Sequence, residues 1–211
     1  MRRTGKKLAA LGVLTVLVFN LAACGTKDFD ASGYVKAFMD AMYHQEYEAY
    51  AELLELSVEE TEQSIIEENK KDIEESYGDL GEITEEDIDK YHNAFYEVFK
   101  NTRFEVKEAE ETEDKNYVVT VEIEPTDTFT KFNEGVEEKA LEAFADAEEI
   151  PTDQEVLDFT IEYLLECNQN VSYGDIVTVE VNVTHDADNV YSIPDEDIEA
   201  LQNAMMPGIS E

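Results

Sequence analysis

The chain has 211 residues, 43% of them hydrophobic, which is enough for the core of one domain or of two small ones. It carries 52 acidic and 15 basic residues, a formal charge of −37. No basic patch could therefore neutralise phosphates, and nucleic acid is excluded as a partner.

The N-terminus has the layout of a signal peptide. Four basic residues precede an apolar segment, 8–19, that is shorter than the roughly 20 residues needed to span a bilayer. A charged start followed by a short apolar run is typical of a secretory signal rather than of a transmembrane helix. The pattern predicts a signal peptide over residues 1–23.

The run ends in Leu21-Ala22-Ala23-Cys24, which resembles the lipobox of bacterial lipoproteins. The resemblance implies that Cys24 is thioether-linked to diacylglycerol, with palmitate-type acyl chains, and begins the mature protein. Two acyl chains give a stable anchor, whereas one holds a protein only marginally. An ordinary cleaved signal with a chance cysteine is the alternative. We expect residues 24–30 to tether a single domain, 31–211, to the extracytoplasmic face of the cell membrane.

Removing residues 1–23 takes away four basic residues and no acidic ones, so the mature chain has 52 acidic and 11 basic groups, or −41. The acids alternate with apolar residues along the chain, which indicates solvated surfaces. Attraction of cations or basic partners is the other interpretation of this charge. An anionic membrane would repel such a domain, so the lipid would hold it.

The first part of the domain, 31–102, has helical periodicity. We expect Asp30 or Ser32 to cap one helix that runs to about Leu56. The Ser57–Glu60 capping box starts a second helix, which Gly78 and Gly81 end, and Thr84–Asp87 starts a third. The predicted buried face of the third helix has five apolar residues: Ile88, Tyr91, Phe95, Val98 and Phe99.

The second part, 103–211, alternates between periods of two and 3.6. A β-hairpin is predicted over 103–124, ended by Pro125, and two helices follow that Pro151 separates. A valine-rich strand at 177–184, a turn at 186–189 and a short strand at 190–193 come next. Asp195 is expected to cap a terminal helix.

This order predicts an α+β fold. Two antiparallel helices between strands return the chain antiparallel to the strand it left, so the sheet should be four-stranded and mostly antiparallel, with helices on one face. A cystatin-like or NTF2-like sheet is a plausible analogy, and it carries no function.

Several segments resemble uncharacterised lipoproteins of Gram-positive bacteria that carry domains of unknown function. They are Tyr34-Val-Lys-Ala-Phe-Met-Asp-Ala-Met-Tyr43, Glu46-Tyr-Glu-Ala-Tyr50, Phe104-Glu-Val-Lys-Glu-Ala109 and Tyr117-Val-Val-Thr-Val-Glu-Ile-Glu-Pro125. The resemblance implies membrane anchorage and a binding or envelope role, and it offers no catalytic residues to transfer.

No catalytic site is predicted. His44, His92 and His185 are far apart and lack metal-ligand spacing, and His92 falls on an apolar stripe where a packed histidine is favoured. Once Cys24 carries lipid, Cys167 is alone, which excludes an internal disulfide or zinc cluster and favours a small core residue over a nucleophile.

No metal or cofactor is predicted either. Asp186-Ala-Asp-Asn-Val-Tyr191 begins like a calcium loop, but the sixth position, which requires glycine, is Tyr191. A β-turn is the favoured interpretation. Carboxylate pairs are too numerous to single out a glycosidase dyad.

The leading hypothesis is therefore a non-enzymatic binding or interaction domain that contacts an envelope protein through an open sheet face. Six polar residues are expected on that face: Thr120, Glu122, Thr178, Glu180, Asn182 and Thr184. The alternative is a small-molecule or divalent-cation carrier, with a pocket between sheet and helices lined by tyrosines such as Tyr117 or Tyr163. An envelope hydrolase is the third hypothesis.

Overall fold

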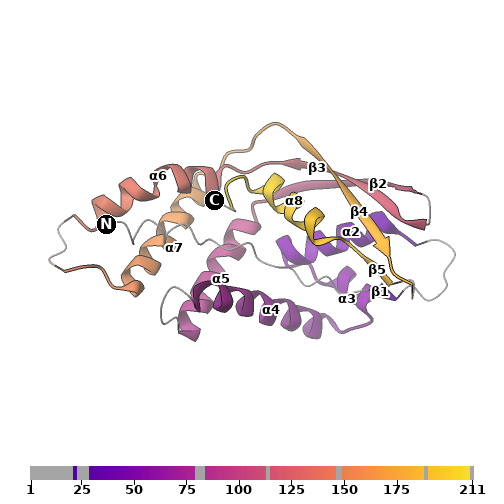
Figure 1. Ribbon diagram of the computed structural model, residues 1–211, viewed down its shortest axis with the longest axis horizontal. Coiled ribbons are helices and arrows are strands. Elements are labelled where there is room, and N and C mark those ends of the chain that lie inside the picture. The colour runs from indigo at the N-terminus through magenta and orange to yellow at the C-terminus, as the bar shows by residue number, and fades with distance from the viewer. Residues whose placement is uncertain are drawn as a thin grey trace.

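The structure is a computed structural model that describes residues 21–22, 29–78, 84–112, 115–145, 149–187 and 190–209. Figure 1 shows an elongated molecule with strands at one end of its long axis and a pair of helices, α6 (Thr128–Ala143) and α7 (Asp153–Gln169), at the other. The fold is α+β, as predicted.

Four strands form an antiparallel sheet: β2 (Arg103–Glu111), β3 (Tyr117–Glu124), β4 (Val177–His185) and β5 (Val190–Ser192). They lie in the order β5-β4-β3-β2, and a two-residue strand, β1 (Leu21–Ala22), pairs with the free edge of β5. The chain leaves β3, passes through α6 and α7, and returns as β4 antiparallel to β3, as the order of elements predicts.

The alternating pattern decides which face of the sheet is buried. Five inward side chains of β3 and β4 are fully buried: Val119, Val121, Ile123, Val181 and Val183. Val177 starts the same row but is 39% exposed, because the row extends past the core. In β2 the register shifts between Val106 and Ala109, a bulge that bends this edge strand.

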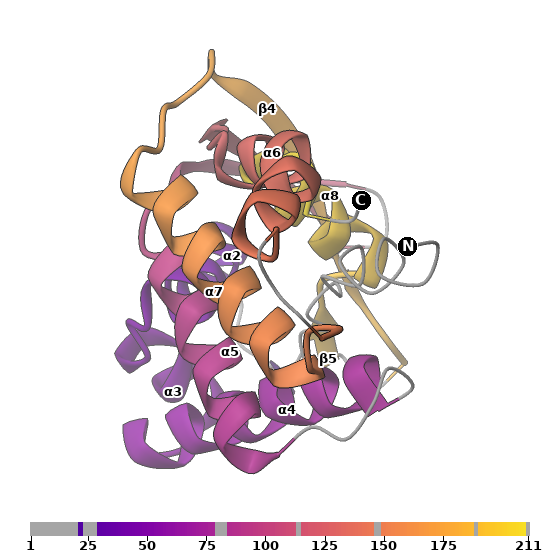
Figure 2. The ribbon, with the colours of Figure 1, turned by 90° about the vertical axis from the view of Figure 1, so that its left-hand side faces the viewer.

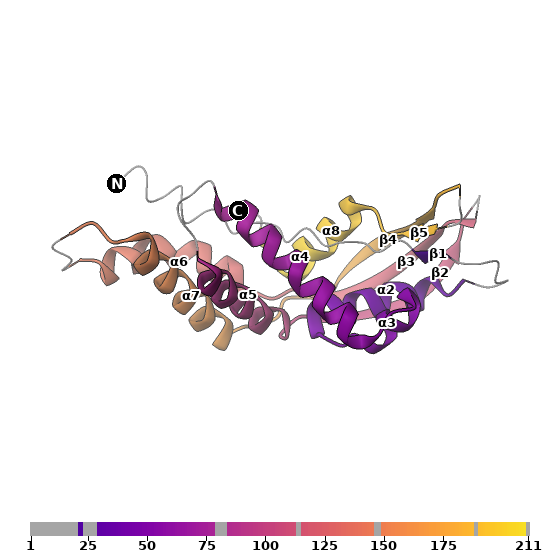
Figure 3. The same ribbon diagram turned by 90° about the horizontal axis from the view of Figure 1, so that it is seen from below.

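Two helices cover the inner face of the sheet. In Figure 1 α2 (Ala31–Met39) and α8 (Asp195–Met205) lie below the strands, and Figure 3, seen from below, shows α2 along β2 and β3 and α8 along β4. The segment that follows α2 meets α8 where the buried hydroxyl of Tyr43 lies next to Gln202. The opposite face of the sheet points away from both helices.

The first helix is not continuous, so the prediction of one helix to Leu56 was wrong. After α2 the chain forms a π-helix, η1 (Asp40–His44), then reaches Gln45 in the left-handed region with φ of 60°, and resumes as α3 (Glu48–Leu54). The i→i+5 bonding of the π-turn changes the direction in which successive side chains point. Met42 and Tyr43 before the break and Tyr47 after it are all buried.

Capping explains where most helices start. Capping boxes form at the N-termini of α4 (Val58–Gly78), α5 (Glu85–Phe99) and α7. They are Ser57–Glu60, Thr84–Asp87 and Thr152–Glu155, respectively. The carboxylate of Asp30 caps α2 by accepting from the Gly33 backbone N–H at 2.8 Å. Ser32 does not cap this helix; its hydroxyl donates to the Lys107 carbonyl at 2.8 Å.

The terminal helix does not use its predicted cap. Pro194 occupies the N-cap of α8 and Asp195 is the first helical residue, without a capping bond. Asp197, two residues later, instead reaches β4, where its carboxylate accepts from the backbone N–H of Asn182 at 2.8 Å and from its side-chain amide at 2.9 Å. The Asp197 contact therefore ties α8 to β4 at a residue beyond the two that pair with β5, while α8 begins without a side-chain cap.

A close approach between helices holds the α6–α7 hairpin together. A Cβ atom on Gly135 of α6 would lie 2.0 Å from the hydroxyl of Tyr163 of α7, so any larger residue there would force the Tyr163 side chain to move. The Tyr163 ring packs against Phe132 and Phe159, and burial raises the pKa of its hydroxyl to about 12.

Candidate binding surfaces

A groove lies between α5 and α7. Its volume is about 640 Å³, within the range of small-ligand sites. Figure 2 shows the two helices side by side with α7 toward the viewer. The lining combines charged, amide and apolar side chains: Gln45, Lys90, Asn93, Ala94, Tyr96, Glu97, Lys100, Asp158, Ile161, Glu162 and Leu165.

Ion pairs frame the groove. The Lys90 ammonium lies 3.3 Å from Asp158 on the facing helix and 3.9 Å from Glu86 on its own. At the other end Lys100 pairs with Glu97. Both cations of the groove are therefore neutralised by neighbouring carboxylates, and the groove has no strong preference for an anion.

Gln45, which lines the groove, has an unusual backbone conformation. It follows the π-helix and has positive φ, which costs a non-glycine residue free energy unless its surroundings hold it. The preceding His44 is held from outside its helix, because its Nε2 lies 3.1 Å from the Thr102 carbonyl and its ring stacks on Phe104 at 4.8 Å. π-Turns are frequent at functional sites, which favours this edge of the groove as one.

The outer face of the sheet is the second candidate surface. Thr178, Glu180 and Asn182 are exposed, and Thr120, Glu122 and Thr184 are half-buried, so the predicted row faces outward. We name this row, together with Arg103, Glu105 and Lys107 of the neighbouring strand β2, the open sheet face.

Ion pairs link two strands across the open sheet face. The Lys107 ammonium lies 2.7 Å from Glu105 and 2.9 Å from Glu122, and these two carboxylates raise its pKa. Arg103 pairs with Glu124 at 3.1 Å. No ion pair joins Glu180 to another described residue, so the β4 side of this face keeps a free negative charge.

The three histidines and Cys167 do not form a site. His44 is engaged with Thr102, and His185 lies at the end of β4 with its ring 5.4 Å from that of Tyr191. In the part of the chain that the structure describes, no histidine hydrogen-bonds to Cys167, which is buried beside Tyr163. Burial raises the pKa of the Cys167 thiol, which disfavours the thiolate that a nucleophile needs.

His92 is packed in the interior, where the sequence places it. It is 6% exposed, and its Nε2 has no hydrogen-bond partner among the described residues. A void too narrow for a water molecule lies beside it, bounded by Asn69 and Tyr96 among others. Burial, followed by the nearby Lys70 ammonium, lowers the His92 pKa, so the neutral ring is favoured.

The described residues contain no group of three or more His, Cys, Asp or Glu side chains arranged to hold a metal ion. Asp186 is occupied locally, because its carboxylate accepts from the Val190 backbone N–H at 3.0 Å and closes the turn. The remaining predicted turn residues, 188–189, lie outside the described part. Among described helices, none is long and apolar enough to cross a membrane.

The groove differs from the pocket that the sequence predicts. Neither Tyr117 nor Tyr163 lines the groove, which lies between two helices rather than between sheet and helices. Tyr117 packs instead against Phe29 and Tyr191. Cys24, the predicted lipidation site, and residues 1–20 and 23–28 lie outside the described residues.

The groove was missed because its residues look like a solvated helix face. Lys90, Asn93, Glu97 and Lys100 recur at helical spacing opposite the apolar stripe of α5. Only the packing of α7 beside that face makes it concave. The one local signal was the polar run around Gln45, which interrupts the first helical pattern.

Comparisons with known proteins show the fold alone. No family model matches the chain, and a search of curated proteins finds no match. Among solved structures, a candidate lipoprotein, ycdA, from Bacillus subtilis subsp. subtilis str. 168 has a similar fold, with a TM-score of 0.59 and 14% sequence identity. The match covers 84% of this chain and 56% of ycdA, so the chain spans little more than half of that protein's length.

Proposed function

We propose that this chain is a lipid-anchored protein of the outer face of the cytoplasmic membrane whose domain binds a partner and catalyses no reaction. The lipobox at 21–24 supports the anchor. The similarity in fold to ycdA, itself a candidate lipoprotein of a Gram-positive bacterium, is consistent with that location.

The observation that carries the binding role is the open sheet face. Helices α2 and α8 cover one side of the sheet, while Thr178, Glu180 and Asn182 on the other side stay exposed. Exposed sheet surface beside an uncompensated carboxylate suits a partner with the opposite charge. We therefore assign the open sheet face to a basic segment of another envelope protein.

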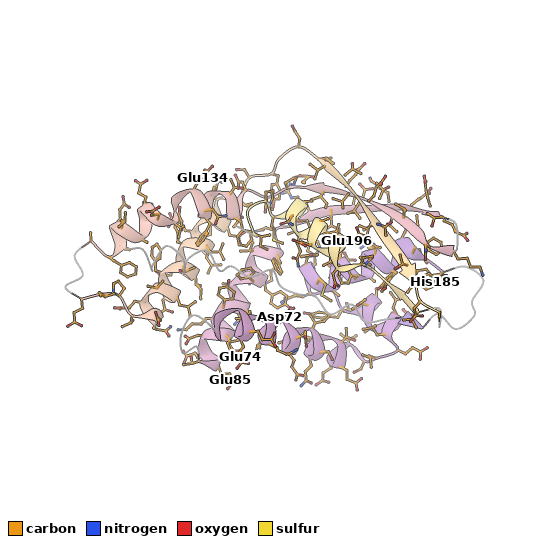
Figure 4. The ribbon with its side chains drawn as sticks, viewed as in Figure 1. Asp72, Glu74, Glu85, Glu134, His185 and Glu196 are labelled. Atoms are coloured by element: carbon orange, nitrogen blue, oxygen red, sulfur yellow. The ribbon has the colours of Figure 1, made fainter. Side chains whose placement is uncertain are left out.

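Site-specific photo-crosslinking in intact cells tests this assignment. A crosslinking amino acid replaces Thr178 on the open sheet face, which keeps the Glu180 carboxylate, or Glu74 on α4 as the control; both positions are exposed, and Figure 4 shows Glu74 on α4, away from the sheet. The expected result is one discrete adduct from position 178 that position 74 does not give and that Glu180→Lys weakens, because the partner is basic. Equal adducts from both positions, or none, would contradict the assignment.

The groove favours a second candidate function, the binding of a small molecule. Its volume and mixed lining suit a ligand with both polar and apolar parts. Thermal unfolding of residues 25–211 in the presence of envelope metabolites, at fixed ionic strength, tests this. A saturable shift that magnesium does not reproduce would support it, provided that Asn93→Trp, which fills the groove, abolishes the shift and Gln63→Trp on α4 does not. An envelope hydrolase is the third hypothesis.

A further inference from the structure

The distance between the lipid and the folded domain is short. Four residues lie between Cys24 and Phe29, which makes five steps along the chain, and an extended chain spans at most about 3.6 Å per step, so the two lie within about 18 Å of each other. Part of this length crosses the headgroup layer, which adds about 5–8 Å to each side of the hydrocarbon core. Phe29 therefore lies within roughly 13 Å of the headgroup surface in a protein that is lipidated at Cys24.

Phe29 is fixed to one place on the domain. Its ring stacks on Tyr191 of β5 with centroids 3.8 Å apart and planes 5° apart, and it lies 5.7 Å from Tyr117 of β3 and 5.8 Å from Tyr34 of α2. Three different elements thus hold the end of the tether. This aromatic cluster prevents the tether from gaining length by peeling away from the domain.

The cluster lies at the end of the sheet where the chain turns from β2 into β3 and from β4 into β5. The register pairs Glu111 with Tyr117 and His185 with Tyr191, which places both turns at the same end. The turns also contact each other, because the His185 backbone N–H donates to the Asn116 side-chain carbonyl at 3.2 Å. We call this end the strand-tip end; Figure 4 shows His185 there, with Glu134 of α6 toward the opposite end.

We infer that the strand-tip end faces the bilayer and that the α6–α7 hairpin points away from it. The inference rests on the proposed lipidation of Cys24. Charge favours this upright arrangement over one in which the domain lies flat. The mature chain carries −41, and an anionic membrane surface repels acidic groups within a Debye length of about 8 Å at physiological ionic strength.

The upright arrangement brings fewer charges into that layer than a flat one. Six acids lie in or beside the two turns in the sequence, and Lys115 opposes them: Glu110, Glu111, Glu113, Asp114, Asp186 and Asp188. A flat domain would instead bring the acids of a whole side near the surface. Strands of nine residues span about 30 Å, and the 16 residues of α6 add about 24 Å beyond them, so the hairpin lies several Debye lengths from the membrane.

Fluorescence energy transfer to the membrane tests the orientation. Glu111→Cys at the strand-tip end and Ile150→Cys beside the hairpin turn each receive a donor dye; both positions are exposed, and Ile150 is 91% exposed. The background carries Cys167→Ala, although Cys167 is buried and labels poorly in the folded protein. Lipidated full-length protein from cells is reconstituted into phosphatidylcholine–phosphatidylglycerol vesicles with an acceptor on the headgroups.

The expected transfer from position 111 is severalfold greater than from position 150. Inserting twenty Gly/Ser residues after Gly25 should reduce this difference, because the longer tether releases the domain. Equal transfer from both positions in protein whose Cys24 lipid is verified by mass spectrometry would overturn the orientation and leave the proposed anchor intact. Protein that carries no lipid on Cys24 would overturn both.

Discussion

Helices α2 and α4 show how differently two amphipathic helices of one domain can be held. Six of the nine residues of α2 are buried between the sheet and its neighbours. Helix α4 has 21 residues, yet its described buried residues form only a thin stripe of every fourth position: Thr61, Ile65, Asn69 and Ile73. The length of a helix is therefore a poor guide to how strongly tertiary contacts hold it.

The two contacts also differ in chemistry. The α2 side is aromatic and aliphatic, with Phe38 fully buried against Tyr50 at a centroid distance of 6.1 Å. On the α4 side, Asn69 donates to the Tyr96 hydroxyl at 3.3 Å, and a void lies beside the unpaired Nε2 of His92. Dispersion contacts are lost at such a void, so each buried residue there contributes less.

The largest expected effect is on the α2 side. Met39→Ala removes a fully buried side chain of α2 and should lower the free energy of unfolding by about 4 kcal/mol. Ile73→Ala on α4 is the matched truncation, because it also removes three heavy atoms beyond Cβ, and its cost should fall near about 2 kcal/mol because the site already borders a void. Urea denaturation measures both, and equal losses would remove the distinction between the two helices.

A smaller effect is expected where α8 meets the sheet. Asp197→Ala leaves both the backbone N–H and the side-chain amide of Asn182 without their charged acceptor and should cost about 1–3 kcal/mol. Asp195→Ala in the same first turn loses no capping bond and should stay within about 0.5 kcal/mol of the wild type. A larger loss of stability for Asp195→Ala than for Asp197→Ala would mean that Asp195 caps α8, as the sequence predicts.

On the α4–α5 side, the start of α5 depends on a local bond. The Thr84 hydroxyl accepts from the Asp87 backbone N–H at 3.2 Å, and the Asp87 carboxylate accepts from the Thr84 backbone N–H at 3.1 Å. Thr84→Ala should therefore cost about 1 kcal/mol, and Thr84→Ser, which keeps the hydroxyl, should be nearly neutral. Chemical denaturation of the two variants distinguishes capping from a general sensitivity of this position.

The smallest effect is a pH dependence from His92. Its folded pKa lies below the value near 6.5 of an unfolded histidine, because the ring is buried and the Lys70 ammonium is nearby. The hydrogen bond to Asn93 and the charge of Asp89 raise the pKa, but they offset this lowering only in part. Between those two pKa values the unfolded chain binds more protons. The stability from the buried neutral ring is therefore present above pH 6.5 and is lost as the pH falls through that window, at less than about 1.4 kcal/mol per pH unit.

His92→Leu removes this titration and leaves the other groups in place, including the Lys70–Asp89 ion pair at 2.6 Å. Unfolding by urea from pH 8 to pH 5, at fixed ionic strength, should show a smaller loss of stability on acidification for the variant than for the wild type. Parallel curves would mean that His92 is not held neutral beneath α4.

Local rules in the sequence determined most of the fold. Alternation over 103–124 and 177–184 identified the strands and their buried rows, because successive side chains of a strand face opposite sides. The Ser57–Glu60 capping box and the Thr84–Asp87 segment located two helix starts, because the bonds that cap a helix lie within four residues. The predicted anchor at Cys24 and the outward row on β3 and β4 also came from sequence alone.

Tertiary structure decided what depends on distant residues. The π-turn before Gln45 ends at His44, which contacts Thr102, 58 residues away, and the groove exists only because α7 packs beside α5. The end of the sheet that holds Phe29 likewise depends on strands at 117 and 191. Periodicity records which side of an element is buried, whereas concave surfaces and the direction of the tether arise from elements that meet only after the chain has folded.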